Sequence, residues 1–458
     1  MTASRTDALD FSPTNRTLAF AIDELAELGA VGGGAVAAAA RQAALRAYLT
    51  FPPPRARPAR MRHDYAALGF ADLTWDSGRM RVPTLPLGRV VPQSAVDRAD
   101  LPALAVENAG GIVHAASSYL QAPASRGDGR VTLASLGDAL RHDPASVAAI
   151  LGCLAPAASD RFVALATAFQ NCGAFVDVPA GVALDAPLQV VWAGAPGGGH
   201  AIFPQTVVRV GAGARVTIVE RHVGNVDAFL CGTVEIDVGA GAHVDYVVVQ
   251  QIDDGARALV TRTARCARAG RIAWHLADLG GALVRSVVAT DLAGDRARAE
   301  TNALFFARGF AHVDLHVTVA HDAAATSSRS IARAAANDRG VGRFYGDVRT
   351  SRRARGTDAI VRGDGLVLSR NAHLEAAPTL EIATNDVAAR QAATIGSLDE
   401  EQLFYVRARG IARGPAERML ALAFFEAAIA RFPSEALRDE VRTALDDRLD
   451  DIGETFST

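Results

Sequence analysis

From about residue 171 to 396, apolar residues alternate with polar residues in short runs, and glycines or charged turns separate the runs. Examples are FVDVPAGVAL, QVVWAG, TVVRVGAGARVTIVE and GTVEIDVGAGAHVDYVVVQ. A period of two predicts β-strands, because successive side chains of a strand point to opposite faces. No convincing long helix intervenes, so we expect a mainly β core over residues 171–396.

One motif in this region is repeated almost verbatim. VGAGARV at 210–216 recurs as VGAGAHV at 238–244, 28 residues later. A coil of parallel strands repeats at one long period, whereas the turns of an antiparallel sandwich recur about every 8–12 residues. The repeat favours a parallel β-helix, and a sandwich is the alternative.

The preceding region, residues 1–170, has the spacing of a mainly helical segment. Apolar residues over 18–48 predict one helix, and SDRFVALATAFQN (159–171) predicts another with Ser159 as its N-cap. FPPPRARPAR (51–60) interrupts the region. Three consecutive prolines suit an extended connector, with a proline-rich ligand segment as the alternative.

The last region, residues 397–458, predicts three helices. Ser397 and Glu400 have the spacing of a capping box, and Gly410 is placed to end the first helix. Pro415 suits the first turn of a second helix, whose apolar positions include Met419, Leu422, Phe425 and Ile429. Ser434 begins a third, with an apolar stripe from Leu437 to Ile452. We expect these helices to cover the last open coil, because exposed strand edges aggregate.

Composition excludes several classes of protein. The formal net charge of the 458 residues is only -3, so no global field attracts nucleic acid or an anionic membrane, and we expect neither as a partner. All 47 basic residues are arginine. Without lysine the chain has neither the P-loop of a Walker-type ATPase nor a Schiff-base catalyst.

The four cysteines, Cys153, Cys172, Cys231 and Cys266, are far apart and form no CxxC pair. This spacing argues against a disulfide framework or a cysteine-only metal site. The N-terminus has no apolar segment typical of a secretion signal, and we expect a cytoplasmic protein.

One cluster has metal-ligand chemistry. If 312–320 is a strand, His312, Asp314 and His316 share one face, and Val313 lies on the other. Histidine and aspartate bind iron or zinc, although an outward polar face in water is the commoner meaning of such alternation. His321 completes the set only if a turn brings it back.

The last third of the chain resembles the SufB/SufD family of the SUF iron-sulfur cluster assembly system, and SufD most. The resemblance lies in HVDLHVTVAH (312–321), TSSRSIARAAANDRGVGRFYGDVRT (326–350), GLVLSRNAHLEAAPTLEI (365–382) and NDVAARQAATIGSLDEEQLFYVRARGI (385–411). It covers about residues 300–430 well and 160–300 weakly. The resemblance implies a right-handed parallel β-helix flanked by N-terminal and C-terminal helical regions.

The resemblance also implies partners. A SufB homologue would pair through the β-helix, with a homodimer as the alternative, and a SufC-like ABC ATPase would contact the C-terminal helices. We expect that contact around Leu403, Phe404, Tyr405, Arg407 and Arg409, with packing within the helices as the simpler role. The chain itself would be a non-catalytic scaffold.

In many SufD proteins the signature carries a cysteine and a histidine near the partner interface. Here Ala389 and Gln391 occupy those positions. Alanine binds no metal, and a glutamine amide is a weak substitute for imidazole on iron. We therefore expect no tightly bound cofactor, only a transient iron-sulfur cluster at the interface with a partner.

Two other functions remain open. A β-helix carbohydrate-active enzyme would need a cluster of acids on one outer face. A direct carrier of an iron-sulfur cluster would use His312 and His316.

Overall fold

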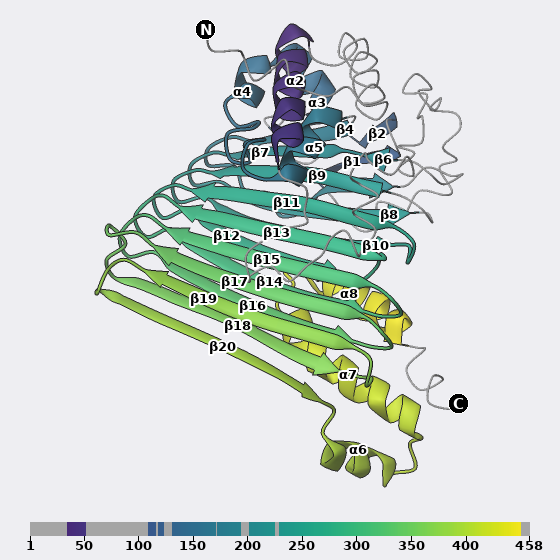
Figure 1. Ribbon diagram of the computed structural model, residues 1–458. Helices are drawn as coiled ribbons and strands as arrows, with labels where there is room; N and C mark the ends of the chain where they lie inside the picture. Colours follow the sequence, from purple (N-terminus) through teal and green to yellow (C-terminus); the bar gives the residue numbers. More distant parts are fainter. Residues whose placement is uncertain are drawn as a thin grey trace, which may run out of the picture.

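The structure is a computed structural model and contains a flattened parallel β-helix with helices at both ends of the chain (Figure 1). Consecutive strands of the β-helix alternate between two sheets. The described residues are 34–51, 109–115, 118–122, 131–170, 172–193, 201–224 and 229–449.

Sheet A runs in the order β2-β1-β5-β8-β10-β12-β14-β16-β18-β20. Its strands, in chain order, are β1 (Gly110–Ala115), β2 (Ser118–Ala122), β5 (Leu188–Ala193), β8 (Arg215–Gly224), β10 (His243–Ile252), β12 (Arg271–Asp278), β14 (Arg298–Ala307), β16 (Ser327–Ala336), β18 (Thr357–Val367) and β20 (Val387–Ser397).

Sheet B runs in the order β19-β17-β15-β13-β11-β9-β7-β4-β3, and β6 also pairs with β9. Its strands, in chain order, are β3 (Thr132–Ser135), β4 (Cys172–Val178), β6 (Ala201–Ile202), β7 (Pro204–Val210), β9 (Phe229–Val238), β11 (Arg257–Cys266), β13 (Leu283–Leu292), β15 (His312–His321), β17 (Val341–Thr350) and β19 (His373–Ile382).

The register between coils explains the sequence repeat. Arg215 pairs with His243, and His243 pairs with Arg271, both in parallel and both 28 residues apart (243 − 215 and 271 − 243). In sheet B, Val210 pairs with Val238. The two copies of the VGAGA motif therefore form the same corner of adjacent coils. The parallel β-helix is confirmed, and the sandwich alternative is wrong.

This corner is a column of residues with left-handed backbone. Amides of the column donate hydrogen bonds to carbonyls at the next corner, as from Gly213 to Ala240 (2.9 Å) and from Ala269 to Asp295 (2.8 Å). Left-handed φ costs most residues about 1–2 kcal/mol but is easy for glycine. The ladder of hydrogen bonds maintains the same bend at corners without glycine. The column consists of Gly181, Gly213, Gly241, Ala269, Arg296, Ala325 and Gly356.

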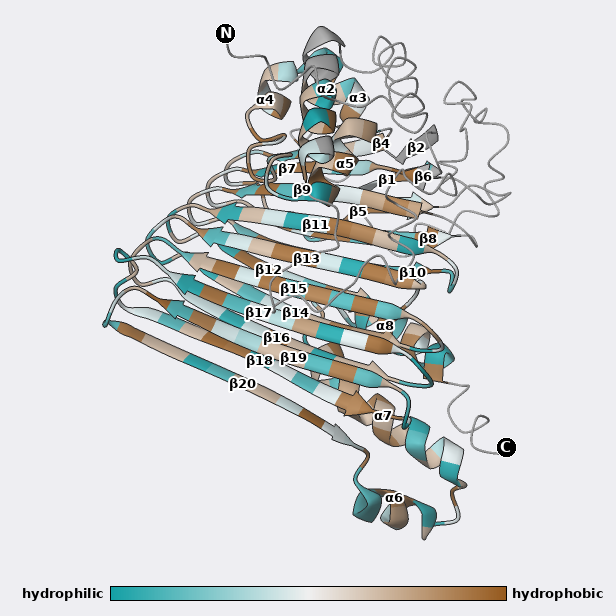
Figure 2. Cartoon of the chain, in the orientation of Figure 1, coloured by the Kyte–Doolittle hydropathy of each residue, from teal (hydrophilic) through white to brown (hydrophobic). Residues whose placement is uncertain are grey.

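The core lies in the lumen between the two sheets. Every second residue of each strand points inward, and apolar and polar positions alternate along the strands in Figure 2. Val216 and Ile218 of β8 and Val244 of β10 are fully buried there. Each coil thus adds a layer of apolar side chains, and the hydrophobic effect stabilises the stack.

The N-terminal region contains both helices and strands. α2 (Gly34–Thr50) and α5 (Arg161–Phe169) pack on the outer face of sheet B, with Tyr48 and Phe169 in the same cluster as Leu259. α3 (Leu136–His142) and α4 (Pro144–Ala148) lie over Phe175 of β4.

Two expectations for this region differ from the structure. The N-cap of α5 is Asp160 and not Ser159, because the Asp160 carboxylate accepts from the amide of Phe162 at 2.8 Å. The region also contributes strands: β1 pairs in parallel with β5 and so extends sheet A. The segment 52–60 of the predicted proline-rich connector and the part of the predicted helix before residue 34 lie outside the described residues.

The C-terminal helices are α6 (Glu400–Arg407), α7 (Arg413–Ile429) and α8 (Glu435–Leu449). They do not cover the last coil as predicted. Instead α7 and α8 lie against sheet A (Figure 1). Phe425 and Val441 of these helices belong to one buried cluster with the outward residues Val247 of β10 and Phe306 of β14. The reason is that the outward positions of these strands are themselves apolar and would otherwise be exposed.

The local signals of these helices are partly confirmed. Gly410 has φ 86° just after α6, and the Ser434 hydroxyl accepts from the amide of Leu437 at 3.3 Å. Ser397, however, ends β20, and Asp399 caps α6 by accepting from the amide of Glu401 at 2.8 Å. Met419 is exposed and does not belong to the buried face of α7.

A buried histidine lies at the end of β15. The ring nitrogens of His321 are 2.8 Å from the Thr326 hydroxyl and 2.9 Å from the Ser328 hydroxyl. Burial lowers the pKa of His321 to about 4, although the charge of Asp322 opposes this shift. The folded chain therefore holds this histidine neutral.

We predict that Phe425→Ala lowers the free energy of unfolding by about 3–5 kcal/mol, because it leaves a cavity between α7 and sheet A. Met419→Ala on the exposed side of the same helix is the matched control and should change it by less than about 0.5 kcal/mol. Chemical denaturation followed by circular dichroism measures both. Equal effects of the two substitutions would contradict the packing of α7 on sheet A.

We predict that His321 makes the protein less stable in mild acid. The folded pKa is about 4 and the unfolded value 6.5. Between them the unfolded chain binds a proton that the folded chain does not, so stability is lost as the pH falls from 6.5 towards 4. The loss is about 1.4 kcal/mol per pH unit.

Denaturation curves across this pH range test the prediction. His321→Gln should remove this part of the slope relative to the unaltered chain. An unaltered slope in His321→Gln would show that the residue does not titrate on unfolding.

Candidate functional site: the terminal coil and the C-terminal helices

The last coil of the β-helix, formed by β19 and β20, is open on one side. Among the described strands, β20 pairs only with β18 and β19 only with β17, so each leaves one edge unpaired. Most residues of β20 are exposed, and so are Ile382 of β19 and Ile395 of β20. Unpaired edges of ten and eleven residues are templates for another chain.

Ala389 and Gln391 lie on this open coil. They pair with Ala359 and Val361, whose side chains point into the lumen. Ala389 packs against the lumen core, and Gln391 is exposed. The two positions that the family resemblance assigns to cluster ligands therefore lie at the open end of the lumen, and neither side chain here is an iron ligand of any strength.

The predicted histidine cluster does lie on the outward face of β15. Val313 and Val317 point into the lumen, and His312, Asp314 and His316 point the other way. Asp314 is buried, and Arg343 of β17 lies 3.8 Å from its carboxylate. The ring of His316 stacks on Tyr345 with centroids 4.7 Å apart.

These contacts do not form a metal centre. His321 lies on the lumen side, bonded to hydroxyls, and does not join the other three residues. Burial and the charge of Arg343 lower the pKa of His312. Within the described ranges, no group of three or more His, Cys, Asp and Glu side chains is arranged to hold a metal ion.

The cysteines are dispersed, as the sequence suggests. Cys172, Cys231 and Cys266 are buried, and burial raises the pKa of each thiol, to about 12 for Cys266. A thiol of such high pKa is a poor nucleophile and a poor metal ligand at neutral pH. Cys153 is exposed, in the loop after α4.

The residues expected to contact an ATPase have two different roles. Leu403 is buried and belongs to the packing of α6, but Phe404 and Tyr405 are 74% and 61% exposed. Arg409 lies over the ring of Tyr405, 3.5 Å from its centroid, and donates to its carbonyl at 3.0 Å. Arg407 is exposed. Two large exposed rings beside arginines have the composition of a protein-binding surface.

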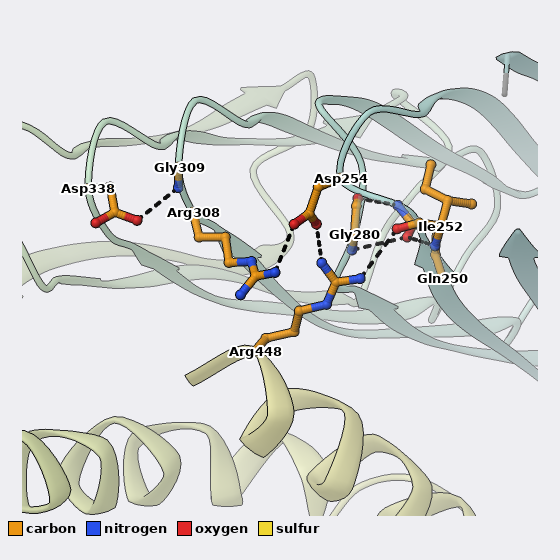
Figure 3. A network of polar contacts seen from close by, with 8 residues as sticks. All are labelled: Gln250, Ile252, Asp254, Gly280, Arg308, Gly309, Asp338 and Arg448. Atoms are coloured by element: carbon orange, nitrogen blue, oxygen red, sulfur yellow. Dashed lines mark hydrogen bonds and ion pairs between the residues drawn. The ribbon is translucent and has the colours of Figure 1, made fainter. Parts of the chain in front are cut away.

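Ion pairs connect α8 to the β-helix. Arg448 of α8 contacts Asp254, which also binds Arg308 at 2.7 Å (Figure 3). Nearer the start of α8, Glu440 makes a bidentate ion pair with Arg221, with both N–O distances 2.8 Å. Guanidinium groups that bind carboxylates in this way fix orientation as well as distance.

Of the described helices, none is long and apolar enough to cross a membrane.

The lumen contains a charged cluster that the sequence analysis missed. The buried carboxylate of Glu220 accepts from Trp192 Nε1 (3.1 Å), Tyr246 Oη (3.0 Å) and Arg262 Nε (3.2 Å), and lies 2.8 Å from His222. Burial raises the pKa of Glu220, but Arg262 and His222 together outweigh it, so the pKa is lowered and the group stays ionised. The sequence holds one signal for this cluster: Glu220 follows Val216 and Ile218 at every second position of β8, so its side chain must also point into the lumen.

The cluster serves the fold. All of these groups are buried, and the carboxylate is fully occupied by donors from its own and neighbouring coils. A buried charge is tolerated when it is paired and hydrogen-bonded. Removing one partner leaves an uncompensated buried charge and destabilises the fold.

Two family models match the chain. The model described as SUF system FeS cluster assembly, SufBD core domain matches residues 192–424, and the SufBD protein N-terminal region matches residues 100–190. Iron-sulfur cluster assembly SufBD family proteins of Staphylococcus saprophyticus and of Staphylococcus aureus (strain USA300) are each 28% identical to the chain.

The first alignment covers 301 residues, 65% of this chain and 64% of the relative, and the second covers 284 residues, 61% of each. The chain thus spans less than two thirds of these relatives. The core model alone covers 233 of the 458 residues (192–424), which is just over half. The chain therefore belongs to the SufBD family of the SUF iron-sulfur cluster assembly system.

Proposed function

We propose that the chain is a SufD-like scaffold subunit that pairs through its terminal coil with a SufB homologue, or with a second copy of itself. The observation that carries this proposal is the open coil of β19 and β20, whose backbone edges and isoleucines Ile382 and Ile395 are exposed. Solenoids need a cap or a partner at such an end. The chain's own helices pack elsewhere, so a partner is the natural cover.

The second partner is a SufC-like ABC ATPase that docks on α6 and the start of α7. Phe404, Tyr405 and the arginines beside them support this docking surface. The absence of lysine supports the same division of labour, because a P-loop cannot be built from this sequence. The chain is then a non-catalytic subunit of a cytoplasmic complex, and ATP hydrolysis belongs to the ATPase.

A cluster handled by this complex takes its ligands from the SufB homologue. Ala389 and Gln391 support this assignment, because neither replaces a thiolate or an imidazole. The chain therefore contributes shape at the interface, and any cluster there is transient. No observation on the described residues favours the carbohydrate-active alternative. A direct carrier through His312 and His316 would need His, Asp and Cys groups that the described residues do not bring together.

Ile395→Asp should abolish pairing, because it places a charge where the partner's strand would cover an apolar side chain. Light scattering on the purified chain measures the homodimer, and copurification measures pairing with the SufB homologue. Met419→Asp, on an exposed site of α7, is the matched control. Pairing that survives Ile395→Asp would refute the terminal coil as the interface.

Replacing both Phe404 and Tyr405 by alanine should reduce capture of the SufC-like ATPase by at least about tenfold, because buried aromatic anchors dominate interface energies. The thermal unfolding of the chain should not change, since both rings are exposed. Phe310→Ala removes an equally exposed ring, 73%, from a turn of the β-helix and is the control. Full capture by the double variant would place the docking surface elsewhere.

A further inference from the structure

A small cavity lies between α7 and the outer face of sheet A. Its volume is about 270 Å³, and its walls come from β14, β16, β18 and the C-terminal end of α7. The charged and amide groups that line it are Arg329, Arg333, Arg362, Arg431, Asp364 and Asn302. Four guanidinium groups therefore face one carboxylate, an excess of three positive charges.

The strand register brings three of these arginines together. Arg329 and Arg333 are four residues apart on β16. Ile331, midway between them, pairs with Arg362 of β18. All three project from the same face, because outward positions recur every second residue. Neighbouring strands are about 4.8 Å apart, so one small ligand is within reach of the three side chains. Arg431, just beyond α7, adds a fourth from the opposite wall.

Most of this hydrogen-bonding capacity is unused within the described part of the chain. Arg362 contacts Asp364 through Nε only, at 2.8 and 2.9 Å, which leaves its terminal nitrogens without a protein partner. The side chains of Arg329 and Arg431 are exposed and make no hydrogen bond or ion pair with described residues. Arg333 is held in place by the carbonyl and the ring of Phe424.

The charges also crowd one another. Burial is the largest cause of the lowered pKa of Arg333; the charge of Asp364 is next and opposes it, and the positive charges of Arg362 and Arg431 lower the pKa further. Like charges that line one cavity repel, and an anion between them relieves that repulsion.

Asn302 adds an unusual requirement. It is 5% exposed, and its Nδ2 donates to the carbonyl of Ala428 at 2.9 Å. That bond fixes the amide, and its Oδ1 is buried without a hydrogen-bond partner. A buried amide oxygen without a donor costs about 1–3 kcal/mol. A ligand that satisfies the cavity therefore offers negative oxygens to the arginines and one O–H to Asn302.

We propose that this cavity binds the hydrogenphosphate ion. Near neutral pH the free ion has three oxygens that accept from guanidinium groups and one protonated oxygen that donates to Asn302 Oδ1. Arginine is well suited to this role, because its planar group binds phosphate through two parallel hydrogen bonds. The bound anion connects α7 to β16 and β18.

Calorimetric titration of the full chain with inorganic phosphate, near neutral pH and at low salt, tests the proposal. We expect saturable binding of one ion per chain. Replacing Arg329 and Arg431 by alanine should weaken it by about 100-fold, or about tenfold for each guanidinium. Neither side chain has a protein partner, so folding should be unaffected. The control replaces Arg352 and Arg370, two exposed arginines of turns, and removes the same charge.

Sulfate and phenyl phosphate complete the test. Sulfate has no proton for Asn302 Oδ1 near neutral pH and should bind at least about tenfold more weakly than phosphate. Phenyl phosphate also lacks this proton near neutral pH, because the second pKa of a phosphate ester is about 6, and it should bind more weakly than the free ion. Tighter binding of phenyl phosphate would contradict the hydrogen bond to Asn302. No saturable binding up to about 1 mM phosphate, or equal losses in the control variant, would overturn the proposal.

Discussion

The parallel hydrogen bonding between successive coils is the constraint on which the rest of the structure depends. Once Arg215, His243 and Arg271 are in register, every residue of the coils is assigned to the lumen or to the outside. A shift by one residue would exchange the two sets along a whole strand. The lumen, the surface that receives α7 and α8, and the arginines of the outer cavity therefore all depend on one choice of register.

The lumen shows how strictly this choice operates. Glu220 is inward because Ile218 is inward, and the fold accommodates the carboxylate with Arg262, Tyr246 and Trp192 from neighbouring strands. A buried charge of this kind is weak evidence for stability in itself, because the cost of removing it from water offsets much of the attraction. Its geometry nevertheless specifies which coils stack next to one another, since an altered register would separate the carboxylate from its donors.

The sequence was sufficient to predict the β-helix and most of its strands, because alternation and a repeat of one coil are local and periodic signals. It also predicted the three C-terminal helices, but the first is capped by Asp399 and not by the predicted Ser397. Their position was wrong, because it depends on outward residues such as Val247 and Phe306, which are far apart in sequence and meet only after the coils stack. The cavity lined by Arg333, Arg362 and Arg431 escaped notice for the same reason.

The position of the helices and the openness of the terminal coil have one physical cause. From β8 to β18 the outward face of sheet A carries large apolar residues such as Val219, Leu304 and Leu366, and α7 and α8 bury them. On β20 the outward residues become small or polar, with Arg390 opposite Ile360 and Ala392 opposite Arg362. β20 therefore offers the helices little apolar area. Burial of the apolar outer face from β8 to β18 determines where α7 and α8 lie. The same change in composition leaves β20 uncovered, and most of its residues are exposed.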